Sequence, residues 1–251
     1  MVIRSPYSYY GSKSKLAQYY PAPEHDLIIE PFAGSAAYAW LHRRRLDGSQ
    51  RQIWLNDLDP KTYSIWNFLT SANAYDIVET YVPNTVVAGQ RVSEILSAPE
   101  IPVGLVEVCR AEANQSTQGA KGVHDVITSM GARCWKVRRK LLEVIPEVSQ
   151  WKITNASYET LANVPATWFI DPPYVGAGQR YRMGSDLINY EELGWFCLTR
   201  QGLSITCENY PADWLPFERL GHTQALIHSR YQKANKPEAI YVHRSELVDP
   251  S

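Results

Sequence analysis

The stretch LIIEPFAGSAAYAWL, residues 27–41, begins as an apolar run and changes character at a turn of small residues. Residues 27–33 predict a buried strand that runs into a turn, and residues 34–41 predict a helix. A strand, a small-residue turn and a helix in this order open a Rossmann-like unit. Because the turn has one glycine and lacks G-x-G-x-x-G, a ligand without phosphates fits it better than a dinucleotide.

The segments that follow extend this α/β pattern. Residues 52–57, QIWLND, predict a second strand that ends in an acid, at the spacing of a nucleotide ribose site. Helical signals cover residues 61–81, a basic amphipathic helix is expected over residues 132–144, and the region 83–122 between them is expected to be irregular. Further strands are expected at residues 151–155, 168–171, 203–207 and 239–242. The carboxyl ends of a mostly parallel sheet meet at one edge, so the polar groups there should share one crevice.

A second unusual stretch, TWFIDPPYVG at residues 167–176, ends one of these strands. Two consecutive prolines have fixed φ angles and no N–H groups, so the strand must end at Asp171. The Asp171 side chain and the neighbouring carbonyls then form a rigid cluster of acceptors beside the ring of Tyr174. Such a cluster suits a ligand that donates hydrogen bonds. A proline-rich loop with a capping Asp is the simpler alternative.

Composition narrows the class of protein. The chain has 251 residues, 45% hydrophobic content and a formal net charge of −1, which suits one large α/β domain with a smaller inserted lobe. Four separated cysteines and six histidines without ligand spacing predict a reduced protein that needs no metal. No apolar run is long enough to span a membrane, so we expect a cytoplasmic protein. Residues 9–15, YYGSKSK, lack the spacing of an ATPase phosphate loop.

Five motifs in order carry a resemblance. They are YGSK at 10–13, EPFAGSAAY at 30–38, NDLDP at 56–60, NASY at 155–158 and DPPY at 171–174. Together they resemble the Dam-type DNA adenine-N6 methyltransferases, which belong to the alpha group of amino-methyltransferases. The resemblance covers most of the chain outside residues 62–150, and the EPFAG and DPPY motifs are its specific part.

The resemblance implies a Rossmann-like methyltransferase sheet that uses S-adenosylmethionine to methylate an adenine flipped out of double-stranded DNA. Catalysis would rest on Asp171, Pro172, Pro173 and Tyr174, with Tyr174 stacked on the base. The resemblance places the cofactor on Tyr10, Lys13, Phe32, Ala33, Gly34, Asp57, Tyr158 and Asp171. Asp171 Oδ and the Pro172 carbonyl would accept the N–H protons of the amine, aim its lone pair at the methyl group and stabilise the positive charge that develops.

The resemblance also divides the chain. Residues 1–61 and 151–251 would form the split catalytic domain, and residues 62–150 an inserted, mostly helical target-recognition region. Basic and amide side chains suit contacts with phosphates and base edges. The candidates for DNA binding are Asn114, Gln118, Arg133, Lys136, Arg138, Arg139, Arg180, Arg182 and Arg230. A monomer suits a base-flipping enzyme of this size. We expect it in the cytoplasm of a bacterial cell or of a phage-infected host. Modification of DNA alongside a restriction enzyme is one biological role that fits.

The chain departs from the family pattern at Ser12 and Ala36, where glycines are common, and in its somewhat short length. The extra methyl group at Ala36 is expected to narrow the cofactor pocket, and it is compatible with the start of a helix. Cytosine-N4 methylation stays open, because a cytosine amine poses the same electronic problem. RNA methylation and a catalytically silent DNA-binding or cofactor-sensing module also remain as alternatives.

Overall fold

The fold is built around one mixed sheet. The computed structural model describes residues 5–9, 11–113, 125–220 and 238–245. Within these ranges a seven-stranded sheet has the order β3-β2-β1-β4-β5-β7-β6. The strands are β1 (Leu27–Glu30), β2 (Gln52–Asn56), β3 (Lys152–Thr154), β4 (Ala166–Ile170), β5 (Gly202–Asn209), β6 (Glu218–Arg219) and β7 (Glu238–Arg244).

Strands β1 to β5 are parallel, and β7 is antiparallel to both β5 and β6. The order reverses between β1 and β4, which is the switch point where open α/β sheets bind ligands. The α/β, Rossmann-like fold class expected from the sequence is therefore confirmed.

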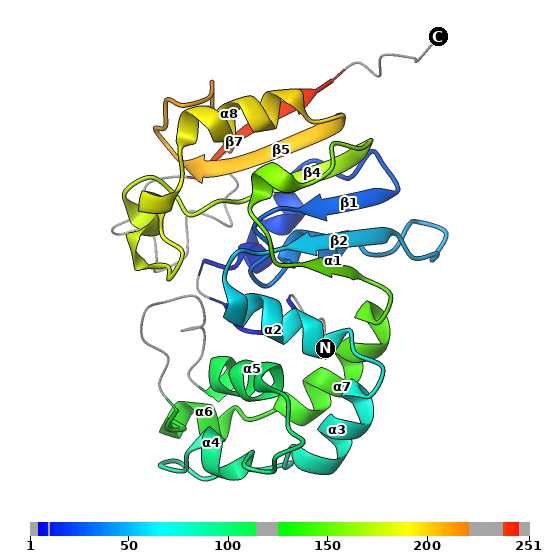
Figure 1. The fold of residues 1–251 in the computed structure, drawn as a ribbon, viewed down its shortest axis with the longest axis vertical. Coiled ribbons are helices and arrows are strands. Elements are labelled where there is room, and N and C mark those ends of the chain that lie inside the picture. The colour runs from blue at the N-terminus through cyan, green and yellow to red at the C-terminus, as the bar shows by residue number, and fades with distance from the viewer. Residues whose placement is uncertain (1–4, 10, 114–124, 221–237, 246–251) are drawn as a thin grey trace.

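Both faces of the sheet are buried, as the apolar runs in its strands require. Ile28 of β1 and Phe169 of β4 belong to one apolar cluster, whereas Ile29 and Trp168 belong to a second cluster on the opposite face. Neighbouring residues of a strand point to opposite faces, so both clusters draw on the same strands. The second cluster is completed by Phe196 and other residues of α8 (Tyr190–Thr199), which lies beside β5 and β7 in Figure 1.

The helices are divided between the sheet and a separate lobe. Short helices near the sheet are α1 (Ala37–His42) and the 3-10 turns η1 (Lys13–Lys15), η2 (Ala17–Tyr19), η3 (Tyr158–Thr160), η4 (Ala177–Arg180) and η5 (Ser185–Leu187). The helical lobe lies between β2 and β3 in the chain and consists of α2 (Pro60–Leu69), α3 (Ala74–Tyr81), α4 (Val92–Ile95), α5 (Val103–Ala113), α6 (Ser129–Arg133) and α7 (Val137–Val148). Figure 1 shows this lobe at one end of the molecule, beyond the β2 side of the sheet.

The helical signals over residues 61–81 are confirmed as two helices, α2 and α3, and the chain turns between them at Ser71, whose N–H donates to the Phe68 carbonyl at 3.0 Å. Two other expectations within the lobe need correction. The region expected to be irregular contains α4 and the longer helix α5. The basic helix expected at 132–144 is divided at Cys134 into α6 and α7. The lobe is nevertheless mostly helical, as expected.

Candidate functional site

A pocket opens at the switch point, where β1, β2 and β4 end. The turn after β1, the residue after β2, η3 and the loop after β4 all contribute to its wall. Most of the side chains expected from the sequence line it: Lys13, Phe32, Ala33, Gly34, Asp57, Tyr158, Asp171, Pro172 and Pro173. The structure therefore brings these residues to one site although they come from distant parts of the chain.

The turn after β1 is held from three sides. Tyr7 Oη and Trp66 Nε1 donate to the Gly34 carbonyl at 2.6 and 2.8 Å, and the Gly34 N–H donates to Asp57 Oδ2 at 2.9 Å. Gly34 has a φ of +46°, and a Cβ built there would lie 2.9 Å from the Tyr9 ring. Ala36 also has a positive φ, at 47°. This left-handed conformation is unfavourable for alanine and is one that glycine adopts readily. These hydrogen bonds hold the backbone of the turn, which lines the pocket.

The Asp57 carboxylate supports the same turn from β2. Its Oδ1 accepts from the Asp59 N–H at 2.9 Å and its Oδ2 accepts from Gly34. Burial raises the Asp57 pKa to about 7, although both N–H groups favour the charged form. A carboxylate has about four lone-pair sites, so two backbone bonds leave capacity for ligand hydroxyls.

Asp171 follows β4 and makes an ion pair inside the pocket. Lys13 Nζ lies 2.9 Å from Asp171 Oδ1, with side-chain exposures of 9% and 20%. Burial raises the Asp171 pKa, and the Lys13 ammonium offsets part of that rise. Burial works against the charge of Lys13, but Asp171 and Glu238 outweigh it, so the Lys13 pKa is raised. The ion pair therefore favours the charged form of each group, although burial still leaves the Asp171 pKa above its ordinary value.

The rest of the DPPY loop is fixed by hydrogen bonds to its backbone. The Tyr190 hydroxyl donates to the Pro173 carbonyl, and the Val175 N–H donates to Glu208 Oε2 at 3.2 Å. Tyr174 is absent from the described lining of the pocket, and the Lys13 ammonium lies over its ring at 4.5 Å from the centroid. The ring expected to stack on a base is thus covered by Lys13 in this structure.

Aromatic side chains form another wall. Phe32 and Tyr158 lie with ring centroids 5.3 Å apart, and Tyr158 packs edge-on against Phe196 at 5.1 Å. Burial raises the Tyr158 pKa to about 12, so its hydroxyl is neutral at physiological pH. Tyr9 and Tyr181 stack at 6.3 Å and also line the pocket. A flat ring system without charge suits these surfaces.

The sequence placed Glu30 at a strand end beside the expected crevice without assigning it a role, and it did not point to Glu238. Glu30 lines the pocket at the end of β1, is 2% exposed, and accepts from the Ala39 N–H at 2.6 Å. Burial raises its pKa well above the ordinary value. Its signal was an acid at the end of a buried strand, the same signal that identified Asp57 and Asp171. Glu238, described further below, had no such signal.

The charge of the pocket is mainly acidic. The cations Lys13 and Arg182 share the pocket with a larger set of carboxyl groups, namely Glu30, Asp57, Asp59, Glu159 and Asp171. Burial raises the pKa of Glu30 and of Asp57, and so opposes the charged forms of these two acids. The pocket is therefore richer in acids than in cations, and a nearby cation would stabilise the charged forms of its carboxyl groups.

The side chains expected to bind DNA differ in their exposure and in their ion pairs. Arg133 and Lys136 are exposed, whereas Arg138 pairs with Glu79 and Arg139 with Glu143, each at 3.8 Å. Arg182 lines the pocket, 3.5 Å from Asp59 Oδ1. Other expected residues lie outside the part of the chain, or the side chains, that the structure describes: Tyr10, Asn114, Gln118, Arg180 and Arg230.

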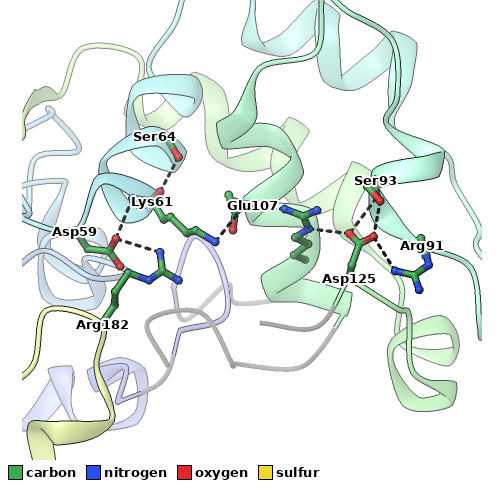
Figure 2. A network of polar contacts seen from close by, with 9 residues as sticks. Asp59, Lys61, Ser64, Arg91, Ser93, Glu107, Asp125 and Arg182 are labelled. Atoms are coloured by element: carbon green, nitrogen blue, oxygen red, sulfur yellow. Dashed lines mark hydrogen bonds and ion pairs between the residues drawn. The ribbon is translucent and has the colours of Figure 1, made fainter. Parts of the chain in front are cut away.

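Figure 2 shows that polar contacts continue from the pocket into the helical lobe. Asp59 caps α2, with its Oδ1 accepting from the Lys61 N–H at 3.0 Å. Lys61 Nζ reaches Glu107 Oε1 of α5 at 3.5 Å, and Glu107 pairs with Arg110 at 2.9 Å. Arg110 then contacts Asp125 at 2.8 Å, which also binds Ser93. The first turn of α2 is therefore shared by the pocket and the lobe.

In the described ranges, no group of histidine, cysteine or acidic residues is arranged to hold a metal ion. No helix within the same ranges has the length and apolar character needed to cross a membrane.

Comparison with known proteins gives a fold likeness at low similarity. No protein-family model and no curated protein matches the chain. Among solved structures, the chain is similar to the rRNA methyltransferase aviRa from Streptomyces viridochromogenes, with 14% identity and a TM-score of 0.35. The match covers 85% of this chain and 74% of that one. A likeness of this size does not identify a function.

Proposed function

We propose that this protein is an S-adenosylmethionine-dependent methyltransferase that modifies the N6 amine of a flipped adenine in double-stranded DNA. One observation carries the proposal: the turn after β1, Asp57 and the loop Asp171–Pro173 share one acidic pocket at the switch point of the sheet. A fold of this kind hosts many activities, so the site must carry the argument.

The pocket fits the chemistry of that cofactor. S-adenosylmethionine supplies an electrophilic methyl group on a cationic sulfonium centre and carries no phosphate. The acidic lining compensates a cation, and the single-glycine turn lacks the close backbone approach that a pyrophosphate needs. Asp57 would accept the ribose hydroxyls, Phe32, Ala33 and Gly34 would line the methionine part, and Tyr158 would lie near the adenine.

Asp171 gives the pocket a role in activating an amine. The lone pair of an exocyclic amine is delocalised into its ring, so the nitrogen is a weak nucleophile. The Asp171 carboxylate and the Pro172 carbonyl would accept its two N–H bonds and stabilise the positive charge that grows as the nitrogen attacks. The hydrogen bond from Tyr190 to Pro173 holds this backbone still. The excess proton would leave through Asp171 or solvent.

Arg133 and Lys136 on the lobe are exposed and would contact DNA phosphates, and Arg182 lies at the pocket itself. The helical lobe would then select the target sequence. The assignment of target selection to the lobe and of methyl transfer to the sheet rests on the resemblance of the motifs and on the exposure of these cations.

The test is transfer of a labelled methyl group. The purified protein is incubated with tritiated S-adenosylmethionine and unmethylated duplex DNA of mixed sequence, and the product is digested to nucleosides. We expect label in N6-methyladenine. Asp171→Ala should lower transfer by about 100-fold or more, since it removes a preorganised acceptor. Asp213→Ala, which removes an exposed acid, is the matched control.

Other outcomes decide between substrates. Label in N4-methylcytosine would keep the mechanism and change the base. Label only when RNA replaces DNA would overturn the DNA assignment. Cofactor binding without transfer to any nucleic acid would favour a silent module, and failure to bind S-adenosylmethionine would reject the proposal as a whole.

A further inference from the structure

Strand β7 brings one more acid to the edge of the sheet where the pocket lies. Because β7 is antiparallel to β5, its first residue, Glu238, pairs with Asn209, the last residue of β5. The start of β7 and the carboxyl ends of the parallel strands therefore lie at the same edge. Glu238 reaches the DPPY loop for this reason, although it is far from that loop in the chain.

The Glu238 carboxylate meets three donors. Its Oε1 accepts from the Tyr174 hydroxyl at 2.5 Å and from the Tyr20 hydroxyl at 2.8 Å, and it lies 3.7 Å from Lys13 Nζ. The Glu238 side chain is 13% exposed. A partly buried carboxylate with this many donors holds each of them in a defined direction.

These contacts restrain the two residues beside Asp171. Tyr174 is fixed at its backbone, where its carbonyl accepts from the Gly178 N–H at 2.6 Å, and at its hydroxyl by Glu238. The Lys13 ammonium lies over the Tyr174 ring and between the carboxylates of Asp171 and Glu238. Burial raises the Tyr174 pKa well above its ordinary value, so the hydroxyl keeps the proton that it donates.

We propose that Glu238 is a positioning residue for amine methylation: it sets the plane of the Tyr174 ring and shares the Lys13 ammonium with Asp171. The proposal rests on the proposed function. Glu238 touches neither the cofactor nor the amine in this scheme. It acts by directing the ring that would stack on the base and by limiting how tightly Lys13 holds the Asp171 oxygen that must accept the amine.

The charge of Glu238 has a separate, measurable consequence. Its negative charge is among the influences that raise the pKa of Asp171, after burial and the opposing effect of Lys13. Glu238→Gln removes that charge and keeps a side chain of the same shape. The Asp171 pKa should then fall, and the acid limb of the kcat profile should move to lower pH. If Glu238 had only a structural role, the acid limb of the kcat profile would stay at the same pH in this variant.

The experiment compares steady-state methyl transfer by the unmodified protein, Glu238→Gln, Tyr174→Phe and the double variant. We expect Glu238→Gln to lower kcat at least tenfold and to leave KM for S-adenosylmethionine within twofold. In the Tyr174→Phe background the same change should cost less, because the hydroxyl through which Glu238 acts is gone. Glu218→Gln, an exposed acid on the adjacent strand β6, is the matched control.

The outcomes separate this inference from the function on which it rests. No transfer by the unmodified protein overturns both. An active unmodified protein with a folded Glu238→Gln variant whose kcat and pH profile are unchanged overturns the role of Glu238 alone. If Glu238→Gln does not fold, Tyr174→Phe decides, since it removes the same hydrogen bond: an unchanged kcat in that variant overturns the role.

Discussion

The Asp57 carboxylate supports the turn after β1 and is also the expected acceptor for ribose hydroxyls. Its ionisation makes both the stability of the fold and the binding of the ligand depend on pH. In the structure its carboxylate accepts the N–H groups of Gly34 and Asp59, and its pKa is raised to about 7 by burial. An unfolded Asp has a pKa of about 3.9, so between this value and 7 the folded state binds more protons than the unfolded state. Stability contributed by the protonated form is therefore lost as the pH rises through this window.

Binding of S-adenosylmethionine should change with pH in the opposite direction and become stronger as the pH rises. If the ionised Asp57 accepts ribose hydroxyls, the affinity for S-adenosylmethionine should be about tenfold weaker at pH 6 than at pH 8. Asp57→Asn should flatten this difference, because the amide does not titrate. Isothermal titration calorimetry at several pH values measures both proteins. An equal slope in the variant would assign the pH dependence to the cofactor's own ionisable groups.

Lys13 is the partner without which Asp171 would be buried unpaired. Lys13→Met should lower the free energy of unfolding by about 3 kcal/mol, the usual cost of breaking a buried ion pair from one side. The Lys13 pKa is raised, so its contribution is fully present at pH 7 and is lost only as the pH rises through the folded value. Urea unfolding measures the loss. Lys13→Arg keeps the charge and should recover part of the stability.

Helices α2 and α5 make the most extensive contact between described helices of the lobe, and a glycine permits their close approach. A Cβ at Gly104 of α5 would lie 2.0 Å from the Ser64 carbonyl oxygen of α2. Gly104→Ala should therefore destabilise the protein by about 1–3 kcal/mol despite the better helix propensity of alanine. Gly194→Ala in α8 is the comparison variant and should cost less, since a Cβ there would lie 3.3 Å from the Trp214 carbonyl oxygen, a tight contact but a far longer one than at Gly104. Equal melting temperatures for the two variants would contradict this account of the helix contact.

Local sequence signals explain which of these elements could be predicted. The strands β1, β2 and β4 contain unbroken apolar runs that are followed by acids, and β5 alternates apolar and polar residues, so both the sheet and the convergence of Asp57 and Asp171 followed from the pattern. Helix α5 was not predicted because its region also contains Pro99, Pro102 and the polar residues 113–119, which favour loops.

Contacts between distant segments could not be predicted in this way. Nothing in the periodicity shows that β7 is antiparallel, and this orientation alone brings Glu238 to Tyr174. The ion pair between Lys13 and Asp171 likewise depends on how the N-terminal segment packs over the sheet. Pairings of this kind are properties of tertiary structure, which local propensity does not encode.

At the scale of the whole molecule, the pocket and the lobe meet at α2. Its first turn contains the cap Asp59, which lines the pocket and contacts Arg182, while Lys61 reaches Glu107 of α5. A ligand on the lobe could therefore influence the pocket through a helix that both share (Figure 2). Under the proposed function, this shared helix would link target selection by the lobe to the chemistry at the sheet.

The exposed cations of the lobe allow a direct test of that division. If Arg133 and Lys136 each neutralise a phosphate, the double variant Arg133→Ala, Lys136→Ala should reduce the slope of log K against log salt by about 1.8. Arg139→Ala should change it less, because Arg139 is paired with Glu143 at 3.8 Å. Fluorescence anisotropy with a labelled duplex at several salt concentrations gives the slopes. An unchanged slope in the double variant would move the DNA surface away from α6 and the start of α7, and with it the assignment of the lobe to target recognition.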